Sequence, residues 1–295
     1  MGALDGRVAV ITGAGRGIGR EHALLFAAEG AAVVVNDRGA TPDGAGADDV
    51  SAAVAVVSEI TARGGMAVAS GDDVADWKGG RRLVETALEA FGRLDVLVNN
   101  AGILRDRALV NMTEADWDSV MNVHLKGHFV PTRWAAAHWR ERCKAGEQVS
   151  ASVVHTSSTS GLVGNFGQAN YGAAKAGIGA FSVICAQELS RYGVRSNCIV
   201  PAARTRLTET AAGLRDVVAP PADGKGFDVW DPANVSPLAA YLATAGCPFN
   251  GATFFVRGGE VRLFEPWRLG PGIEHEDRWT VAGLESELAR FATPG

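Results

Sequence analysis

The stretch Arg7-Val-Ala-Val-Ile-Thr-Gly-Ala-Gly-Arg-Gly-Ile-Gly19 decides the fold of this chain. It opens with an apolar run typical of a strand buried on both faces and continues into a glycine-rich turn. Glycines after a first strand allow a sharp turn and let backbone N–H groups approach a pyrophosphate at the start of the next helix. The turn therefore predicts a dinucleotide-binding site. The expected contacts are Gly13, Arg16, Gly17, Ile18 and Gly19.

Short apolar runs alternate with longer amphipathic segments along the rest of the chain. The predicted strands are 7–11, 31–36, 66–70, 95–99, 152–156, 195–200 and 252–256. The predicted helices are 21–29, 47–63, 79–90, 113–141, 171–191 and 233–243. Continuous apolar strands between helices are typical of parallel strands buried on both faces. The pattern predicts an α/β fold with one doubly wound parallel sheet of the Rossmann type, in a single domain covering residues 1–295.

Two stretches depart from this alternation. Residues 202–230 are rich in glycine and proline, with a short helical pattern near 209–217. Such a long connection after a strand predicts a lid or substrate loop, and a disordered loop is the alternative. The C-terminal extension 260–295 includes Trp267 and Trp279, so we expect it to pack on the domain or to lie in a subunit interface.

Composition excludes several classes of partner. The 295 residues are 47% hydrophobic and carry 28 basic against 33 acidic side chains, which gives no reason to expect nucleic acid or an anionic membrane as a partner. No apolar run approaches the roughly 18 residues that a membrane span needs, and the N-terminus has no signal-peptide pattern. The four cysteines are too far apart for a Cys-x-x-Cys pair, so we expect a reducing, cytoplasmic location.

The end of the second predicted strand indicates which dinucleotide binds. Asp37 follows that strand directly. A carboxylate there can accept hydrogen bonds from the ribose hydroxyls of NAD and would repel the 2′-phosphate of NADP. Arg38 comes next and could bind that phosphate instead. The sequence therefore favours NAD and leaves NADP as the alternative.

Tyr171-Gly-Ala-Ala-Lys175 opens a predicted helix and predicts acid/base chemistry. Residues four apart share one helix face. A phenol has a pKa of about 10, and a nearby ammonium and an oxidised nicotinamide both favour the phenolate. Such a tyrosine can exchange a proton with an alcohol or a carbonyl oxygen. The pair alone would be common by chance, but Ser158 follows a neighbouring strand and could hydrogen-bond the same oxygen.

Together these residues resemble the short-chain dehydrogenase/reductase family of the single-domain type. The matching positions, within residues 5 to 260, are Thr12–Gly19, Asp73-Val74, Asn99–Gly102, Asn122, Ser158, Tyr171 and Lys175. The resemblance implies that Ser158 polarises the substrate oxygen and that Tyr171 transfers the proton. It also implies that Lys175 binds the nicotinamide ribose and lowers the tyrosine pKa. Asn122, inside the predicted helix 113–141, would hold a water that links Lys175 to solvent.

The resemblance also implies further cofactor contacts and an assembly. Asp73 and Val74 would flank the adenine, and Pro201 would lie near the nicotinamide amide, although Ala202 stands where many members have glycine. The adenosine side would be lined by Asn100, Ala101 and Gly102. The long helices at 113–141 and 171–191 would pack between subunits of a homo-dimer or homo-tetramer.

A narrower resemblance concerns the substrate. Four stretches, 35–37, 123–127, 160–171 and 205–208, resemble the (3R)-hydroxyacyl-CoA dehydrogenase part of peroxisomal multifunctional enzyme type 2 and its bacterial relatives. That resemblance implies a 3-hydroxyacyl thioester or a steroid-like alcohol as substrate. We therefore expect an NAD-dependent oxidoreductase that transfers a hydride between nicotinamide and a secondary alcohol or ketone.

Other readings of the site remain open at this level. The alternatives are a ketoreductase that uses NADPH, a non-catalytic dinucleotide-binding module, and a different reaction on the same fold such as epimerisation or dehydration. A metal is not expected. His124-x-x-x-His128 has spacing that could bind zinc, but no catalytic Glu lies between the two histidines.

Overall fold

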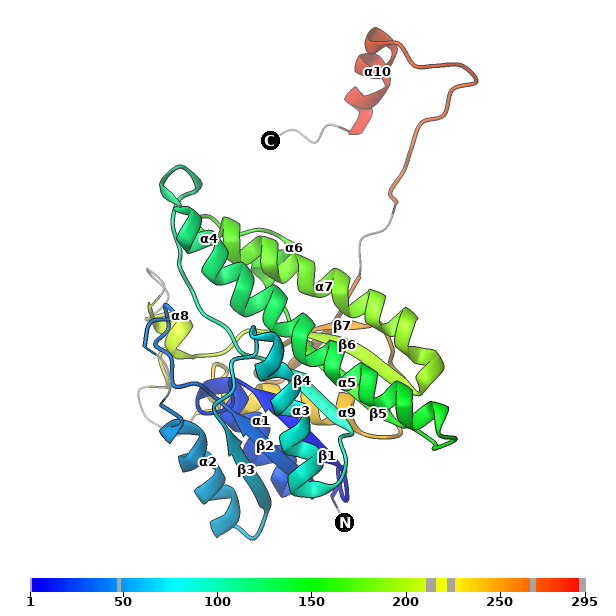
Figure 1. Cartoon of the computed structure of the whole chain (residues 1–295). Helices are drawn as coiled ribbons and strands as arrows, with labels where there is room; N and C mark the ends of the chain where they lie inside the picture. The colour runs from blue at the N-terminus through cyan, green and yellow to red at the C-terminus, as the bar shows by residue number, and fades with distance from the viewer. Residues whose placement is uncertain (1, 47–48, 211–215, 222–225, 266–268, 292–295) are drawn as a thin grey trace. The chain divides into compact units, whose positions relative to one another are not determined.

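One mixed sheet organises the part of the chain that the structure describes, residues 2–46, 49–210, 216–221, 226–265 and 269–291 (Figure 1). In this computed structural model the strands are β1 (Val8–Thr12), β2 (Ala32–Asn36), β3 (Met66–Ser70), β4 (Val96–Asn99), β5 (Ala151–Thr156), β6 (Val194–Pro201), β7 (Thr253–Arg257) and β8 (Glu260–Phe264). Their order is β3-β2-β1-β4-β5-β6-β7-β8, and all neighbours are parallel except β7 and β8. The Rossmann-type fold predicted from the sequence is therefore confirmed.

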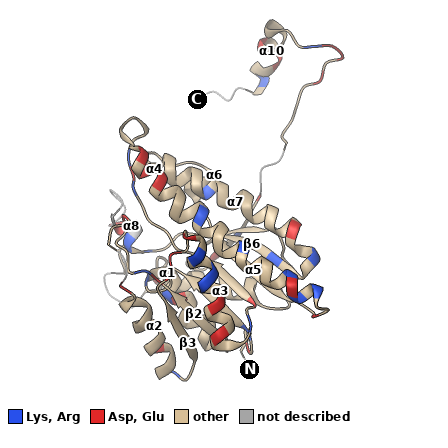
Figure 2. Ribbon diagram, in the orientation of Figure 1, with Lys and Arg blue, Asp and Glu red and all other residues tan. Residues whose placement is uncertain are grey.

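Helices cover both faces of this sheet. They are α1 (Gly17–Ala28), α2 (Ser51–Ala62), α3 (Trp77–Phe91), α4 (Glu114–Met121), α5 (Gly127–Lys144), α6 (Thr159–Leu162), α7 (Ala169–Leu189), α8 (Arg206–Thr210) and α9 (Ser236–Ala243). Neighbouring residues of β1 point to opposite sides: Ile11 packs in a cluster with α1, α2 and α9, whereas Val10 packs in one with α3 and α5. This two-sided burial explains why the strands are continuously apolar. Charged residues lie mostly on the helices and loops, and the strands carry few (Figure 2).

The last strand was not predicted from the sequence. β8 follows β7 after the turn Gly258-Gly259 and pairs with it in the antiparallel direction. Val261 is 52% exposed and Leu263 is 61% exposed, and two charged residues interrupt the apolar ones in Glu260–Phe264. β8 therefore lacks the apolar run by which the other strands were predicted. Residues 260–264, expected to belong to the C-terminal extension, are part of the sheet.

The long helix predicted at 113–141 is interrupted. A π-helix, Asn122–Lys126, separates α4 from α5. The wider turn comes shortly before Pro131, which has no N–H to donate to the carbonyl one turn earlier and crowds it.

The chain divides into two compact units, Met1–Phe264 and Glu265–Gly295, which are described separately. The second unit contains α10 (Val281–Leu288), whose first turn is capped by the Thr280 hydroxyl, which accepts a hydrogen bond from the Gly283 N–H at 3.1 Å. Trp267, expected to contribute to packing of the extension, lies outside the described residues.

In the substrate loop expected at 202–230, α8 covers only the start of the helical pattern predicted at 209–217, and residues 211–215 and 222–225 lie outside the described part. None of the helices that the structure describes is long and apolar enough to cross a membrane.

Candidate active site

A cavity of about 340 Å³ opens at the carboxyl ends of the parallel strands. It contains every residue that the sequence predicted as a cofactor contact: Gly13, Arg16, Gly17, Ile18, Gly19, Asp37, Asp73, Val74, Asn100, Ala101, Gly102, Tyr171, Lys175 and Pro201. These residues come from loops far apart in the sequence. They lie together because parallel strands all end at the same edge of the sheet. Their contacts with a cofactor stay a prediction.

The glycine turn leaves no room for side chains. A Cβ atom at Gly19 would lie 2.2 Å from the Gly13 carbonyl oxygen, and one at Gly13 would lie 2.7 Å from Ala101 Cα. Gly13 also has φ +63°, which disfavours other residues. The Thr12 hydroxyl accepts hydrogen bonds from the N–H groups of Asn100 (2.9 Å) and Ala101 (3.1 Å), which ties β1 to β4. The turn is thus fixed at the N-terminus of α1, where a pyrophosphate fits.

Asp37 stands at the end of β2 with both carboxylate oxygens held by the backbone. One oxygen accepts a hydrogen bond from the Gly15 N–H at 2.9 Å, and the other accepts one from the Gly39 N–H at 2.7 Å. Arg38, which could have bound a 2′-phosphate, forms an ion pair with Asp73. The orientation of Asp37 is therefore built into the turn and does not depend on a ligand.

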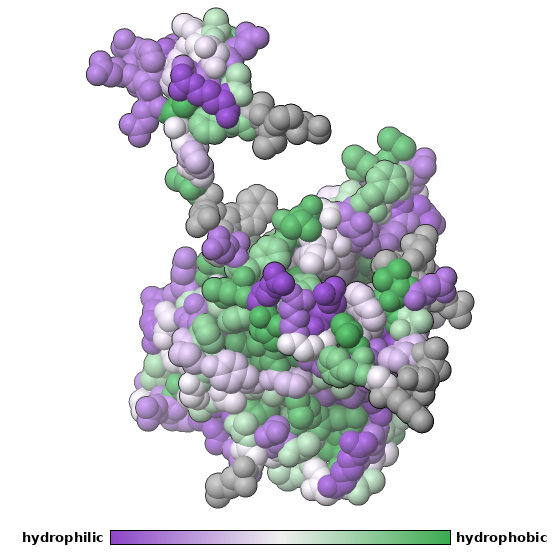
Figure 3. All heavy atoms as spheres, turned by 180° about the vertical axis from the view of Figure 1, so that it is seen from behind, coloured by the Kyte–Doolittle hydropathy of each residue, from purple (hydrophilic) through white to green (hydrophobic). Residues whose placement is uncertain are grey.

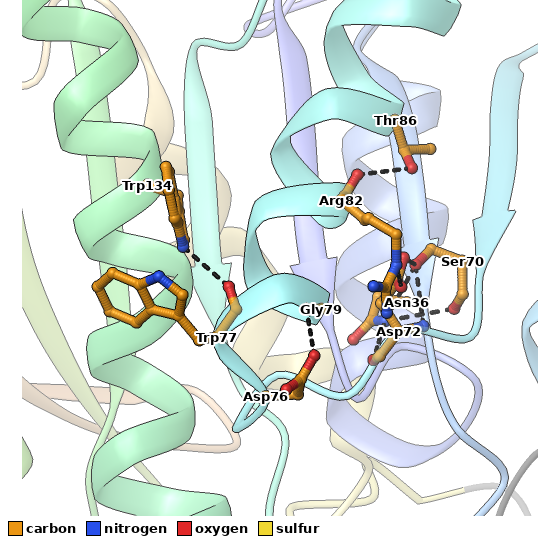
Figure 4. A network of polar contacts seen from close by, with 9 residues as sticks. All are labelled: Asn36, Ser70, Asp72, Asp76, Trp77, Gly79, Arg82, Thr86 and Trp134. Atoms are coloured by element: carbon orange, nitrogen blue, oxygen red, sulfur yellow. Dashed lines mark hydrogen bonds and ion pairs between the residues drawn. The ribbon is translucent and has the colours of Figure 1, made fainter.

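The loop after β3 forms another wall of the cavity and is held by a polar network (Figure 4). The Asn36 amide donates to the carbonyl oxygen of Asp72 at 2.9 Å, and Arg82 of α3 donates to the Asp72 carboxylate at 2.6 Å. Asp76 caps α3 by accepting a hydrogen bond from the Gly79 N–H at 2.6 Å. These contacts position Asp73 and Val74, which follow Asp72 directly.

Ser158 and Tyr171 lie at the N-terminal ends of α6 and α7, and the Ser158 hydroxyl is close enough to the Tyr171 phenol to lower its pKa. Ser158 caps α6, and its hydroxyl accepts a hydrogen bond from the Ser160 N–H at 3.2 Å. Burial of the Tyr171 hydroxyl raises its pKa to about 12, and the hydrogen bond with Ser158 opposes that rise. A tyrosine in this state holds its proton firmly, so it becomes a base only when positive charge is added nearby.

Lys175 is buried one helical turn beyond Tyr171. Its Nζ lies 5.4 Å from the centre of the Tyr171 ring and donates a hydrogen bond to the Thr156 carbonyl oxygen at 2.7 Å. Burial lowers the pKa of Lys175 to about 7. The expectation that Lys175 lowers the tyrosine pKa is therefore not visible in the protein alone, where burial of both groups dominates.

The structure does not bring Asn122 into the cavity. Asn122 begins the π-helix and its side chain is exposed, whereas Val123 and His124 of this segment line the cavity. Residues two positions apart on a helix point in directions about 200° apart, so only one of them can face the site. The role expected for Asn122, to hold a water that links Lys175 to solvent, stays a prediction, and the residue lies outside the lining of this cavity.

His124 was considered from the sequence only as a possible metal ligand. Its ring is fully buried and meets the Tyr171 ring edge-on, with centroids 5.1 Å apart. Its Nε2 lies 2.7 Å from the Ile103 carbonyl oxygen and 3.1 Å from the Ile103 N–H, so the Ile103 backbone holds the ring in place. Burial, and then the Lys175 charge, lower its pKa to about 3, so it is neutral. Within the described ranges, no three His, Cys, Asp or Glu side chains could together hold a metal.

Comparison with known proteins identifies relatives of this arrangement. Residues 7–216 match the family described as short chain dehydrogenase. The chain is 44% identical over 267 residues to the hydroxyacyl-CoA dehydrogenase ChsB1 of Mycobacterium tuberculosis. The aligned region covers 89% of this chain and 81% of the relative. It is 47% identical over 248 residues to peroxisomal multifunctional enzyme type 2 of Drosophila melanogaster. The aligned region covers 84% of this chain but only 38% of that longer enzyme.

A solved structure agrees with these sequence relatives. A short chain dehydrogenase from Mycobacterium avium superposes with a TM-score of 0.86 at 49% identity, covering 98% of this chain and 95% of that one.

Proposed function

The chain belongs to the short-chain dehydrogenase family and is an NAD(P)-dependent oxidoreductase, and we propose that it interconverts a secondary alcohol and a ketone with Tyr171 as acid/base. One observation carries the proposal: the Tyr171–Ser158 pair and Lys175 lie at the same strand edge as a glycine turn that fits a pyrophosphate. A hydride acceptor and a proton acceptor are the two groups that alcohol oxidation requires.

The chain's own residues divide the proton chemistry between them. Ser158 would donate a hydrogen bond to the substrate oxygen, and Tyr171 would take its proton in oxidation and return it in reduction. Lys175 already gives one hydrogen bond to Thr156, and the remaining donors of its ammonium would hold ribose hydroxyls. The bound nicotinamide would accept or supply the hydride, and its oxidised form adds the positive charge that favours the Tyr171 phenolate.

Replacement of Tyr171 tests the proposal. Tyr171→Phe keeps the ring that packs against His124 but removes the hydroxyl. We expect turnover to fall by roughly two to four orders of magnitude, the usual scale of general acid–base catalysis, while dinucleotide binding persists. The measurement is formation of reduced nicotinamide with wild type and variant. Equal turnover would show that Tyr171 is not the acid/base, and an inactive wild type that still binds NAD would favour a non-catalytic module.

For the cofactor we propose NAD. Support comes from Asp37, whose carboxylate is oriented by Gly15 and Gly39, and from Arg38, which is paired with Asp73. Asp37→Ala should raise kcat/KM for NADP relative to NAD by about tenfold, because it removes the repulsion of the 2′-phosphate. Arg38→Ala should leave the preference unchanged. A loss of NADP activity in Arg38→Ala would instead show that Arg38 binds the phosphate.

For the substrate we propose a 3-hydroxyacyl-CoA thioester, with a steroid-like (hydroxysteroid) alcohol as the other member of the test panel. The support is the similarity to relatives named hydroxyacyl-CoA dehydrogenase and multifunctional enzyme type 2. The test compares kcat/KM for 3-hydroxyacyl-CoA thioesters, steroid alcohols and simple secondary alcohols. A preference for simple alcohols would contradict the proposal.

We further propose a homo-dimer or homo-tetramer in the cytoplasm. Phe129 on α5 and Ile184 on α7 are large apolar side chains that remain exposed on helices of the face in Figure 1. The opposite face mixes apolar and hydrophilic surface (Figure 3). Ile184→Glu should reduce the mass seen by analytical ultracentrifugation, whereas Val54→Glu on α2 should not.

The four cysteines are unpaired, which fits a reducing compartment such as the cytoplasm. Cell fractionation checks this location.

A further inference from the structure

A chain of hydrogen bonds leads from the Tyr171–Ser158 pair to a carboxylate on a distant loop. The Ser158 hydroxyl accepts from the Ser160 N–H at 3.2 Å, and the Ser160 hydroxyl donates to the Gln168 side-chain oxygen at 2.7 Å. The Gln168 amide nitrogen then donates to Asp106 Oδ2 at 2.8 Å. Asp106 is thus linked to Ser158 through Ser160 and Gln168, although it lies far from them in the sequence.

The backbone reinforces this connection. Arg107 N–H donates to the Gly167 carbonyl oxygen at 2.9 Å, and the Asn170 amide donates to the Arg105 carbonyl oxygen at 3.1 Å. Asn170 in turn accepts a hydrogen bond from the Tyr171 N–H at 2.7 Å. The loop around Asp106 therefore braces the first turn of α7, the turn that carries Tyr171.

Asp106 has an unusual surrounding for a carboxylate. Its Oδ1 is buried and has no hydrogen-bond partner among the described residues, and Gln168, which holds Oδ2, is only 8% exposed. A buried oxygen without a hydrogen-bond partner is unfavourable for folding. The charge is close enough to Tyr171 to raise the pKa of its phenol, after the larger effects of burial and of Ser158.

We propose that Asp106 is a positioning residue for the reaction: through Gln168 it holds the Ser158 segment against α7, and its carboxylate is a fixed negative charge beside Tyr171. The proposal rests on the acid/base function proposed for Tyr171. It gives Asp106 two separable effects, one through the hydrogen bond to Gln168 and one through charge.

Other titratable groups around Tyr171 could also act on its phenol. The Lys175 Nζ on the same helix lies 5.4 Å from the centre of the Tyr171 ring, and its pKa is lowered to about 7 by burial. His124 from the π-helix is neutral because its pKa is lowered to about 3. The two arginines beside Asp106 have other contacts: Arg105 donates to the Asp43 carbonyl oxygen at 2.8 Å, and Arg107 is exposed. Above about pH 7, where the phenol titrates, Lys175 and His124 are therefore both neutral, and Asp106→Asn tests the charge that raises the pKa of Tyr171.

Two variants separate the effects. Asp106→Asn removes the charge but can still accept the Gln168 hydrogen bond. We expect its kcat/KM profile for alcohol oxidation to move to lower pH by roughly 0.5–1 unit, with maximal kcat within about threefold of wild type. Gln168→Leu keeps the charge and breaks the link. We expect a fall in maximal kcat of about tenfold or more, without that shift to lower pH.

Asp118→Asn is the matched control, because Asp118 is an exposed carboxylate on α4. It should change neither quantity. An Asp106→Asn profile at the wild-type position would overturn the charge effect, and wild-type kcat in Gln168→Leu would overturn the link to Ser158.

A second readout does not need turnover. The chain has three tyrosines, so 13C NMR of labelled tyrosine can follow the Tyr171 phenol, with Tyr171→Phe to assign its signal. The titration of that signal should move to lower pH in Asp106→Asn. If the wild type oxidises no alcohol in the panel but this shift is seen, the proposed function fails and the charge effect of Asp106 stands. If turnover is normal and no shift is seen, only the inference about Asp106 fails.

Discussion

At the scale of single residues, Lys175 combines a functional position with a cost in stability. Its pKa falls from 10.5 to about 7 because the ammonium is buried. The unfolded chain therefore binds the extra proton more readily between these two values. Below about pH 7 the folded protein carries the whole cost of the buried charge, and the cost disappears as pH rises toward 10.5.

Lys175→Met should therefore be more stable than wild type at pH 6, by about 2–5 kcal/mol, and the advantage should shrink toward pH 10. Urea unfolding across this range measures the difference. Lys144→Met is the control, because Lys144 is exposed on α5 and should show no such pH dependence. A difference for Lys175→Met that is the same at every pH would contradict the assignment of a buried ammonium.

At the scale of elements, the contact between α6 and α7 determines where Ser158 lies. A Cβ atom at Gly161 would be 2.5 Å from the Ala176 backbone nitrogen, so the two helices touch through a glycine. Gly161→Ala should push α6 away from α7 and move Ser158 from Tyr171. We expect a fall in kcat of about tenfold and a loss of about 1–3 kcal/mol in unfolding free energy.

Gly179→Ala on α7 is the matched control for this contact. Its Cβ would meet Leu162 Cδ2 at 3.8 Å, an ordinary contact, and alanine favours a helix over glycine by up to about 1 kcal/mol. It should be neutral or stabilising and should leave kcat unchanged. Kinetics and thermal unfolding of both variants make the comparison, and equal behaviour of the two would exclude the tight contact as the cause.

At the scale of the whole molecule, four buried histidines make folding sensitive to acid. Burial lowers the pKa of His22, His124 and His155 to about 3, and that of His128 falls well below its ordinary value. The unfolded chain binds these protons near pH 6.5. Stability contributed by the neutral rings is therefore complete above that pH and is lost as pH falls toward 3.

The free energy of unfolding should fall by several kcal/mol between pH 7 and pH 5, about 2 kcal/mol for each fully buried histidine. His22 offers a test away from the active site, since its Nδ1 is 2.8 Å from the Ser236 hydroxyl between α1 and α9. In His22→Gln the loss of unfolding free energy between pH 7 and pH 5 should be smaller by about 2 kcal/mol, the contribution of one buried histidine. Urea unfolding that is unchanged from pH 7 to 5 would mean that these rings are not kept neutral by burial.

The sequence by itself determined the features that depend on local pattern. Seven of the strands were predicted from their apolar runs. The residues predicted to bind a cofactor all line one cavity, because parallel strands end at the same edge of the sheet. Tyr171 and Lys175 share a helix face for the same local reason.

Only the tertiary structure decided the features that depend on burial and on distant partners. The π-helix turns His124 rather than Asn122 toward Tyr171, and β8 joins the sheet with an exposed surface. The contact of Asp106 with Gln168 spans a large separation in sequence. A pKa depends on how much water a group has lost and on which charges surround it, so the high pKa of Tyr171 and the low pKa of Lys175 arise only when the chain is folded.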